Sequence, residues 1–172
     1  ILYFEIGDGP AALDAATAAT AAQGLSQVLS GRNCALALFG AADVAGKSAS
    51  DIFGEVDAAL GLSTDDSRRQ LIIYGNGTSV LAPYAFSGAA VGGFYAEDSD
   101  FTVPQDAQFK SRAYILDLTD MGTNYKEMLA AFCALRDNGA PNQYRVRNGS
   151  DNLQGAQRGL ASMTSFMNLP VM

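Results

Sequence analysis

Apolar residues at helical spacing predict helices in several parts of this chain. The range 11–30 consists almost wholly of helix-forming residues, with Pro10 suited to a first helical turn and Gly31 to a C-terminal stop. Further helices are predicted over 50–60, 124–136 and 151–167. The long helix over 11–30 is therefore the most regular element that the sequence predicts.

Short apolar runs and alternating patterns predict strands between these helices. Strands are predicted over 34–39, 70–74, 78–81, 114–118 and 143–147. The Asn76-Gly77 step between two of these strands is typical of a tight turn that needs a positive φ, so 70–81 is expected to form an antiparallel hairpin. The range 83–108 is rich in Gly, Ala, Ser and Asp and is expected to be a long loop held by its aromatic residues.

The length of 172 residues, 48% of them hydrophobic, favours one domain with its own core. We expect a single globular domain over 1–172, made of an apolar stub and a helix breaker over 1–10, the helix over 11–30 and a head over 34–172. No stretch approaches the roughly 20 apolar residues that span a bilayer, so membrane contact is expected only through a segment preceding Ile1.

Charge and histidine content exclude several classes of function. The formal net charge of −7 repels nucleic acid, so we expect no nucleic-acid partner. The chain has no histidine, which removes the side chain most used for proton transfer near neutral pH and for binding transition metals. The sequence therefore predicts no catalytic residues, no metal and no cofactor.

Gly46-Lys47-Ser48 follows an apolar run and precedes a predicted helix, as a phosphate-binding loop would. The glycine spacing is wrong for that loop, because Ala41 stands where the first glycine is needed and Gly40 lies one residue too far away. Asp117, at the end of an apolar strand, could imitate the magnesium-binding acid of such enzymes. A solvated loop lysine is the favoured interpretation.

Acidic residues in the 83–108 range offer a second candidate site. Oxygen ligands for calcium could come from Glu97, Asp98, Asp100 and Asp106, although the order of an EF-hand is absent. A solvated acidic surface is favoured, and a ligand of this loop stays open. The glycosylation patterns at Asn76 and Asn148 are more typical of turns.

Cys34 and Cys133 are the two cysteines of the chain. Their spacing fits neither a metal motif nor a disulfide-dense miniprotein, so one disulfide and two buried thiols both remain open. A bridge between them would close a long loop and stabilise the fold by about 4–5 kcal/mol in the chain-entropy model.

The order of these elements resembles the soluble part of a type IV pilin, in particular of the type IVb branch. The matching features are the apolar start Ile1–Phe4 before the 11–30 helix, the run 114–121 before the 124–136 helix, and the strand over 143–149. Glu5 stands at the position of that family's early glutamate, but Gly7-Asp8-Gly9-Pro10 follows it, so its role is not carried over. The resemblance implies an α+β fold in which a long N-terminal helix packs on an antiparallel sheet.

The resemblance also implies a function. The chain would be a non-enzymatic subunit of a type IV pilus or pseudopilus, exported to the bacterial cell surface and assembled with copies of itself or related pilins into a filament for adhesion, motility or secretion. Its assembly interface would comprise Ile1, Leu2, Tyr3, Phe4, Ile6 and Leu13. Two alternatives are a small P-loop-like nucleotide-binding enzyme that uses Lys47, Ser48 and Asp117, and a virion or other surface coat protein.

Overall fold

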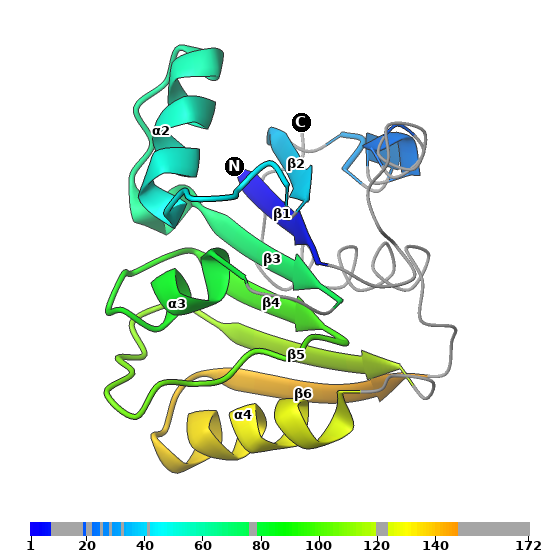
Figure 1. Ribbon diagram of the computed structural model, residues 1–172, viewed down its shortest axis with the longest axis vertical. Coiled ribbons are helices and arrows are strands. Elements are labelled where there is room, and N and C mark those ends of the chain that lie inside the picture. The colour runs from blue at the N-terminus through cyan, green and yellow to red at the C-terminus, as the bar shows by residue number, and fades with distance from the viewer. Residues whose placement is uncertain are drawn as a thin grey trace.

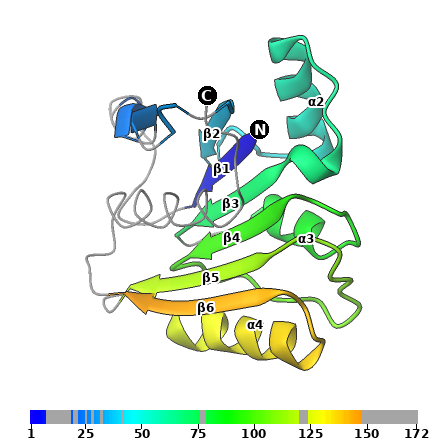
Figure 2. The same ribbon diagram turned by 180° about the vertical axis from the view of Figure 1, so that it is seen from behind.

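A parallel β-sheet forms the centre of the protein in the computed structural model (Figure 1). The structure describes residues 1–7, 19, 22–24, 26–27, 29–31, 33–40, 42–75, 79–119 and 124–147. The six strands of the sheet lie in the order β2-β1-β3-β4-β5-β6, and every neighbouring pair is parallel. Seen from behind, the strands keep the same order (Figure 2). The fold is therefore α/β, and the predicted α+β fold is wrong.

The strands and helices alternate along the chain. The strands are β1 (Leu2–Ile6), β2 (Leu36–Gly40), β3 (Gln70–Tyr74), β4 (Gly93–Glu97), β5 (Tyr114–Thr119) and β6 (Asn142–Arg147). The helices are α2 (Ala49–Leu60), the short 3₁₀ turn η1 (Asp66–Arg68), α3 (Leu81–Ala85) and α4 (Tyr125–Asp137). Helices connecting parallel strands in this way define an α/β sheet.

The predicted hairpin over 70–81 is wrong. Its first half is β3, but β3 pairs in parallel with β1 on one side and β4 on the other. Its second half leads into α3, which begins at Leu81, while Asn76, Gly77 and Thr78 lie outside the described residues. All five residues of β3 are buried, as expected for a strand covered on both faces. A two-residue turn cannot join parallel strands, so the turn signal misled the prediction.

The start of the chain is a central strand and not an exposed stub. β1 lies between β2 and β3, with Leu2 opposite both Leu36 and Gln70. Of the predicted 11–30 helix, the described residues between 19 and 27 are helical, residues 29 and 30 form a turn, and the remaining positions lie outside the described part. A long N-terminal helix on an antiparallel sheet is excluded, because the chain enters the parallel sheet at Leu2.

Several elements predicted from periodicity are confirmed. The helices expected over 50–60 and 124–136 are α2 and α4, and the strands expected over 114–118 and 143–147 are β5 and β6. The strand expected over 34–39 is β2, shifted by a residue or two. The range 83–108 was expected to be a loop, yet it holds part of α3 and all of β4. The helix predicted over 151–167 lies outside the described residues.

The main apolar cluster lies between one face of the sheet and the helices α2, α3 and α4. Alternate strand residues such as Tyr3, Leu71 and Phe94 point into this cluster, while their neighbours Leu2 and Ile72 belong to the cluster on the other face. α3 packs on β3, and α4 packs on β5 and β6 (Figure 1). The central strands β1, β3 and β4 are thus buried on both faces.

Arg69 ties α2 to the start of β3. Its Nη2 lies 3.0 Å from Asp57 Oδ2, its Nη1 lies 2.8 Å from Asp66 Oδ1, and its guanidinium lies 4.8 Å above the Phe53 ring centre. The Tyr84 hydroxyl donates to the Asp66 carboxylate, which connects α3 to the same cluster. A buried charge needs such partners, so Asp57 and Asp66 stabilise the fold by neutralising Arg69.

The Asp57→Asn variant is expected to be less stable at pH 7 by about 1–3 kcal/mol, because it leaves Arg69 without one of its carboxylates. Burial raises the pKa of Asp57, but the hydrogen bond from the Thr64 N–H and the charge of Arg69 outweigh it, so the pKa falls below its ordinary value of 3.8. Because the pKa of Asp57 is lower in the folded protein, its carboxylate stabilises the fold at pH values above the pKa of the unfolded chain. This stabilisation is lost as the pH falls through the pKa of Asp57 in the folded protein.

Urea unfolding of both proteins at pH 7 and at pH 3 measures this effect. The difference between wild type and Asp57→Asn is expected to be smaller at pH 3. A difference that stays constant over this range would contradict the assignment. Glu55→Asn is a matched control on the same helix, because Glu55 is exposed and its ion pair with Lys47 lies at the surface.

Neither Cys34 nor Cys133, both of which the structure describes, forms a disulfide. Of the two possibilities that the sequence left open, the disulfide between Cys34 and Cys133 is therefore wrong. Among the described helices, none has the length and apolar character needed to cross a membrane. The single-domain organisation over 1–172 stays a prediction.

Candidate functional site

The connections of the sheet change direction between β1 and β3. The chain passes from β1 to β2 on one side, whereas β3, β4, β5 and β6 follow in order on the other side. Open parallel sheets bind ligands in the crevice outside the carboxyl ends of the strands at such a switch point. The fold therefore indicates where a site should lie before any side chain is considered.

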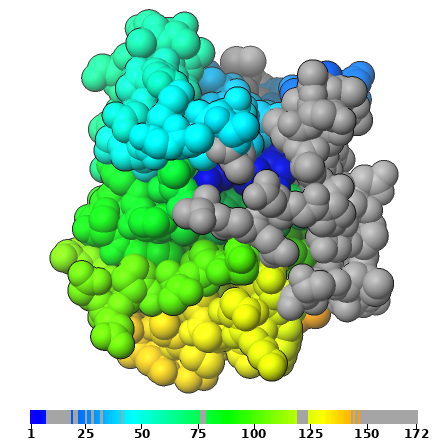
Figure 3. All heavy atoms as spheres, in the orientation of Figure 1, coloured from blue at the N-terminus to red at the C-terminus, as the bar shows by residue number. Residues whose placement is uncertain are grey.

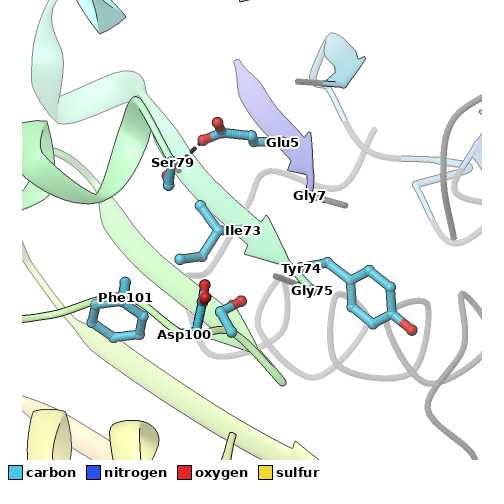
Figure 4. A pocket seen from close by; sticks show the side chains of 9 residues that line it. Glu5, Gly7, Ile73, Tyr74, Gly75, Ser79, Asp100 and Phe101 are labelled. Carbon is cyan, nitrogen blue, oxygen red and sulfur yellow. Dashed lines mark hydrogen bonds between the residues drawn. The ribbon is translucent and has the colours of Figure 1, made fainter. Parts of the chain in front are cut away.

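A crevice lies at this switch point, with about 240 Å³ of empty space that is partly open to solvent. It is lined by residues at or after the carboxyl ends of β1, β3 and β4 (Figure 4): Glu5, Gly7, Ile73, Tyr74, Gly75, Ser79, Ser99, Asp100 and Phe101. Glu5 and Ser79 point toward each other on one side of the crevice, and Asp100 and Phe101 lie on the opposite side. Most of this space is open to solvent, so the enclosed part of the crevice is small.

Glu5 and Ser79 form the central polar contact of this crevice. The Ser79 Oγ donates a hydrogen bond to Glu5 Oε2 at 2.6 Å (Figure 4). The backbone N–H of Val80 donates to Glu5 Oε1 at 3.0 Å, and that of Leu81 donates to Oε2 at 3.2 Å. Glu5 is only 3% exposed, and a buried carboxylate needs such donors.

The start of α3 holds Ser79 in place. Its Oγ accepts hydrogen bonds from the backbone N–H groups of Leu81 at 3.1 Å and Ala82 at 3.0 Å, as a hydroxyl does at a helix start. Because its lone pairs face these donors, the hydroxyl hydrogen is directed at Glu5. The arrangement is a hydroxyl nucleophile beside a group that can accept its proton.

Buried acids lie at the end of β4 and within β5. The Tyr95 hydroxyl lies 2.7 Å from Glu97 Oε2 and 3.1 Å from Asp117 Oδ2, and all three side chains are fully buried. Asp98 adopts a φ of +45° and its carbonyl accepts a hydrogen bond from Asn124 Nδ2 at 2.6 Å. This bond joins the end of β4 to the start of α4.

The acidic residues expected to form a solvated surface or a calcium site are divided by the structure. Glu97 and Asp98 are buried, whereas Asp100 and Asp106 are exposed. Within the described residues, no group of His, Cys, Asp or Glu side chains is arranged to hold a metal ion. The prediction of a solvated acidic run is thus wrong for Glu97 and Asp98, which the strand buries.

The nucleotide-site residues Lys47, Ser48 and Asp117 are not brought together as a P-loop site. Lys47 Nζ pairs with Glu55 at 2.8 Å. Ser48 begins α2 in a capping box with Asp51, whose pKa is lowered by the hydrogen bond from the Ser48 N–H. Asp117 is buried in β5 beside Tyr95. The nucleotide-binding alternative is therefore wrong, and Gly46-Lys47-Ser48 is a helix start.

The residues expected to form an assembly interface lie mostly in the sheet. Leu2, Tyr3 and Phe4 are fully buried in β1, and Ile6 is nearly so. Ile1 is partly buried, and Leu13 lies outside the described residues. These side chains form the core on either side of β1.

Reasoning from sequence missed the pairing of Glu5 with Ser79. One signal was present, since Glu5 is the sole charged residue in the apolar run 1–6, and a lone acid in a buried strand needs partners at the strand end. A second signal was the succession of the apolar strand 70–74, a Gly-rich turn and Ser79.

No family model matches this sequence, and no curated protein is significantly similar to it. Among solved structures, a ferulic acid esterase superposes with a TM-score of 0.68 at 12% sequence identity. The match covers 96% of this chain and 83% of the esterase chain. The protein therefore shares the fold of that esterase chain.

This similarity overturns the predicted resemblance to a type IV pilin. The parallel sheet leaves no basis for a pilus or pseudopilus subunit, and the coat-protein alternative fits no better. The likeness to an esterase also overturns the prediction that the chain is not an enzyme.

The strand–turn–helix unit β3–α3 corresponds in kind to the unit that carries the nucleophile in α/β hydrolases. In the motif G-x-S-x-G the serine stands third, whereas Gly75–Ser79 reads Gly-Asn-Gly-Thr-Ser, so its serine stands fifth. The 172 residues contain no histidine to complete the usual triad. Any hydrolytic chemistry of this chain must therefore use another base.

Proposed function

We propose that this protein is a hydrolase that cleaves a carboxylic ester at the switch-point crevice, with Ser79 as the nucleophile and Glu5 as the base. The observation that carries this proposal is the 2.6 Å hydrogen bond from Ser79 Oγ to Glu5 Oε2 in that crevice. The fold shared with a ferulic acid esterase supports the choice of reaction class.

The reaction proceeds in two steps. Ser79 Oγ attacks the carbonyl carbon of the ester while its proton passes to Glu5, and the bond to the alcohol oxygen then breaks as Glu5 returns the proton to the departing alcohol. A water molecule next attacks the acyl-serine carbonyl carbon and gives its proton to Glu5. The serine oxygen leaves with that proton, so the carboxylic acid is released and Ser79 is restored.

Glu5 can serve as base because of its position rather than its residue type. A general base must lie within hydrogen-bond reach of the proton it removes, and Glu5 meets that condition in the absence of any histidine. The backbone N–H groups of Val80 and Leu81 fix its two oxygens, so the carboxylate is already oriented toward the hydroxyl.

Covalent labelling with an alkyl fluorophosphonate tests this proposal directly. Phosphonylation of Ser79 is expected, measured as a mass increase of the intact protein and located by peptide mapping. Ser79→Ala is expected to abolish the label, whereas Ser87→Ala, at the other end of α3, is expected to keep it. Labelling at Ser99, which lines the same crevice, or no labelling of the wild type would contradict the proposal.

A further inference from the structure

The switch-point crevice has an open rim and a small buried floor. Gly7 is partly exposed and Asp100 is exposed, whereas Ile73, Ser99 and Phe101 are buried. In the space-filling view, dark-blue atoms of the N-terminal segment are visible at the surface (Figure 3). The enclosed part of the crevice has room for about one group of the size of a water molecule, which is also about the size of a methyl group.

The side chains of the floor cannot retreat to make more room. Phe101 is 7% exposed, and its ring stacks on that of Phe86 at 5.8 Å and meets that of Phe94 edge-on at 5.4 Å. Ile73 lies in β3, which is paired on both sides with other strands. Protein cores are packed as closely as organic crystals, so a larger crevice would require several side chains to move together. The floor therefore sets a fixed limit on size.

The order of bond breaking decides which part of the ester faces this floor. In the proposed reaction the alcohol departs first, while the acyl group stays bonded to Ser79 until water attacks it. The departing alcohol and the incoming water both need a path to solvent, so the alcohol belongs at the rim formed by Gly7 and Asp100. The acyl group then lies between Ser79 and Phe101, which stand on opposite sides of the crevice (Figure 4).

We infer that the substrate is an acetyl ester and that Phe101 and Ile73 exclude longer acyl groups from the crevice. The inference rests on the proposed function, since it places the ester carbonyl at Ser79. The alcohol part of the substrate meets no such limit, because it faces solvent. The crevice thus selects for the length of the acyl chain and not for the alcohol.

Rates for esters that share one leaving group test this inference. The substrates are 4-nitrophenyl acetate, 4-nitrophenyl butanoate and 4-nitrophenyl hexanoate, so differences in kcat/KM report on the acyl part. We expect kcat/KM to fall at least about tenfold from the acetate to the butanoate, because two further methylene groups must be placed against a floor that cannot move. A smaller fall, or a rise, would overturn the inference.

A variant with a smaller side chain at the floor provides the second arm. Phe101→Leu is expected to raise the ratio of kcat/KM for the butanoate to that for the acetate at least about threefold, because it removes part of the wall. Phe109→Leu is the matched control. The Phe109 ring also contacts Phe86 and Tyr114, but it does not line the crevice, so the ratio is expected to stay unchanged.

A milder pair of variants covers the case in which Phe101→Leu does not fold. Ile73→Val removes one methyl group from the floor, whereas Ile72→Val removes one from the other face of the same strand. The ratio is expected to rise in Ile73→Val and to stay unchanged in Ile72→Val. An equal ratio in Ile73→Val and Ile72→Val would overturn the role of the floor.

The size of the crevice can also be measured without the proposed reaction. In Ser79→Cys, an alkyl methanethiosulfonate forms a mixed disulfide with the thiolate and releases methanesulfinate, which leaves the alkyl chain beside the floor. The methyl reagent is expected to label residue 79 at least about tenfold faster than the butyl reagent, as measured by mass spectrometry of the peptides. Ser87→Cys, at an exposed position beyond the other end of α3, is the control and is expected to react equally fast with both.

The two proposals can fail independently. Absent phosphonate labelling of Ser79 together with length-dependent labelling of Ser79→Cys would reject the nucleophile and keep the size limit. Phosphonate labelling of Ser79 together with equal kcat/KM for the acetate and the butanoate would keep the reaction and reject the size limit.

Discussion

Replacing Ser79 with alanine is expected to lower kcat/KM for 4-nitrophenyl acetate by at least about 10³-fold, since removal of a nucleophile removes the covalent route. Initial rates from nitrophenolate absorbance at pH 7.5 provide the measurement.

Glu5→Gln is expected to cause a loss of similar size, because an amide cannot accept the proton of Ser79 at neutral pH. Asp106→Asn changes the net charge of the protein by the same amount as Glu5→Gln, but at an exposed acid. We expect this variant to retain full activity. An active Ser79→Ala protein would reject the proposed nucleophile, and an active Glu5→Gln protein would reject the base.

Loss of fold is separated from loss of chemistry by a third variant. Ser79→Ala removes an acceptor for two backbone N–H groups and is expected to cost about 1 kcal/mol of stability. Ser79→Cys keeps an atom at the same place. We expect this thiol to be acylated by 4-nitrophenyl acetate and to be blocked by iodoacetamide. A folded Ser79→Cys protein that is inert to both reagents would contradict the reactive position proposed for residue 79, which is partly buried.

The Phe86→Ala variant is expected to destabilise the protein by about 3–5 kcal/mol, as other truncations of buried aromatic residues do. Phe86 is 2% exposed. Its ring contacts four other rings, those of Phe94, Phe101, Phe109 and Tyr114. Urea unfolding at pH 7 measures the change.

Tyr125→Ala is the control for this prediction, because its aromatic side chain is 52% exposed. We expect its stability to lie within about 0.5 kcal/mol of wild type. Equal stabilities of the two variants would contradict the central place of Phe86 in the core.

Local patterns predicted individual elements well and their arrangement poorly. The periodicity of α2 and α4 comes from one buried face, which the sequence displays directly. The strands that pair with β3 are distant in the sequence, so no local pattern identifies them. The nearby Asn-Gly step therefore predicted a hairpin that does not form. β4 was missed because Gly93 and Ala96 give it a loop-like composition, although all five of its residues are buried.

The candidate site could not be predicted from the sequence for a similar reason. Glu5 and Ser79 lie 74 positions apart, and only the parallel register of β1 with β3 brings them together. The sequence could show that Glu5 was a lone acid in an apolar run, but not which donors would compensate it. The absence of histidine was taken as evidence against any enzyme, whereas the structure places the Glu5 carboxylate within hydrogen-bond distance of the Ser79 hydroxyl.

The interior position of β1 has a consequence for biosynthesis. This strand leaves the ribosome before both of its partner strands, because Leu2 pairs with Leu36 and Gln70. Its two hydrogen-bonding edges must therefore stay unsatisfied until both partner strands have emerged, and pairing of this long range is slow and prone to aggregation. The Leu2–Ile6 segment is thus the expected binding site for chaperones on the nascent chain.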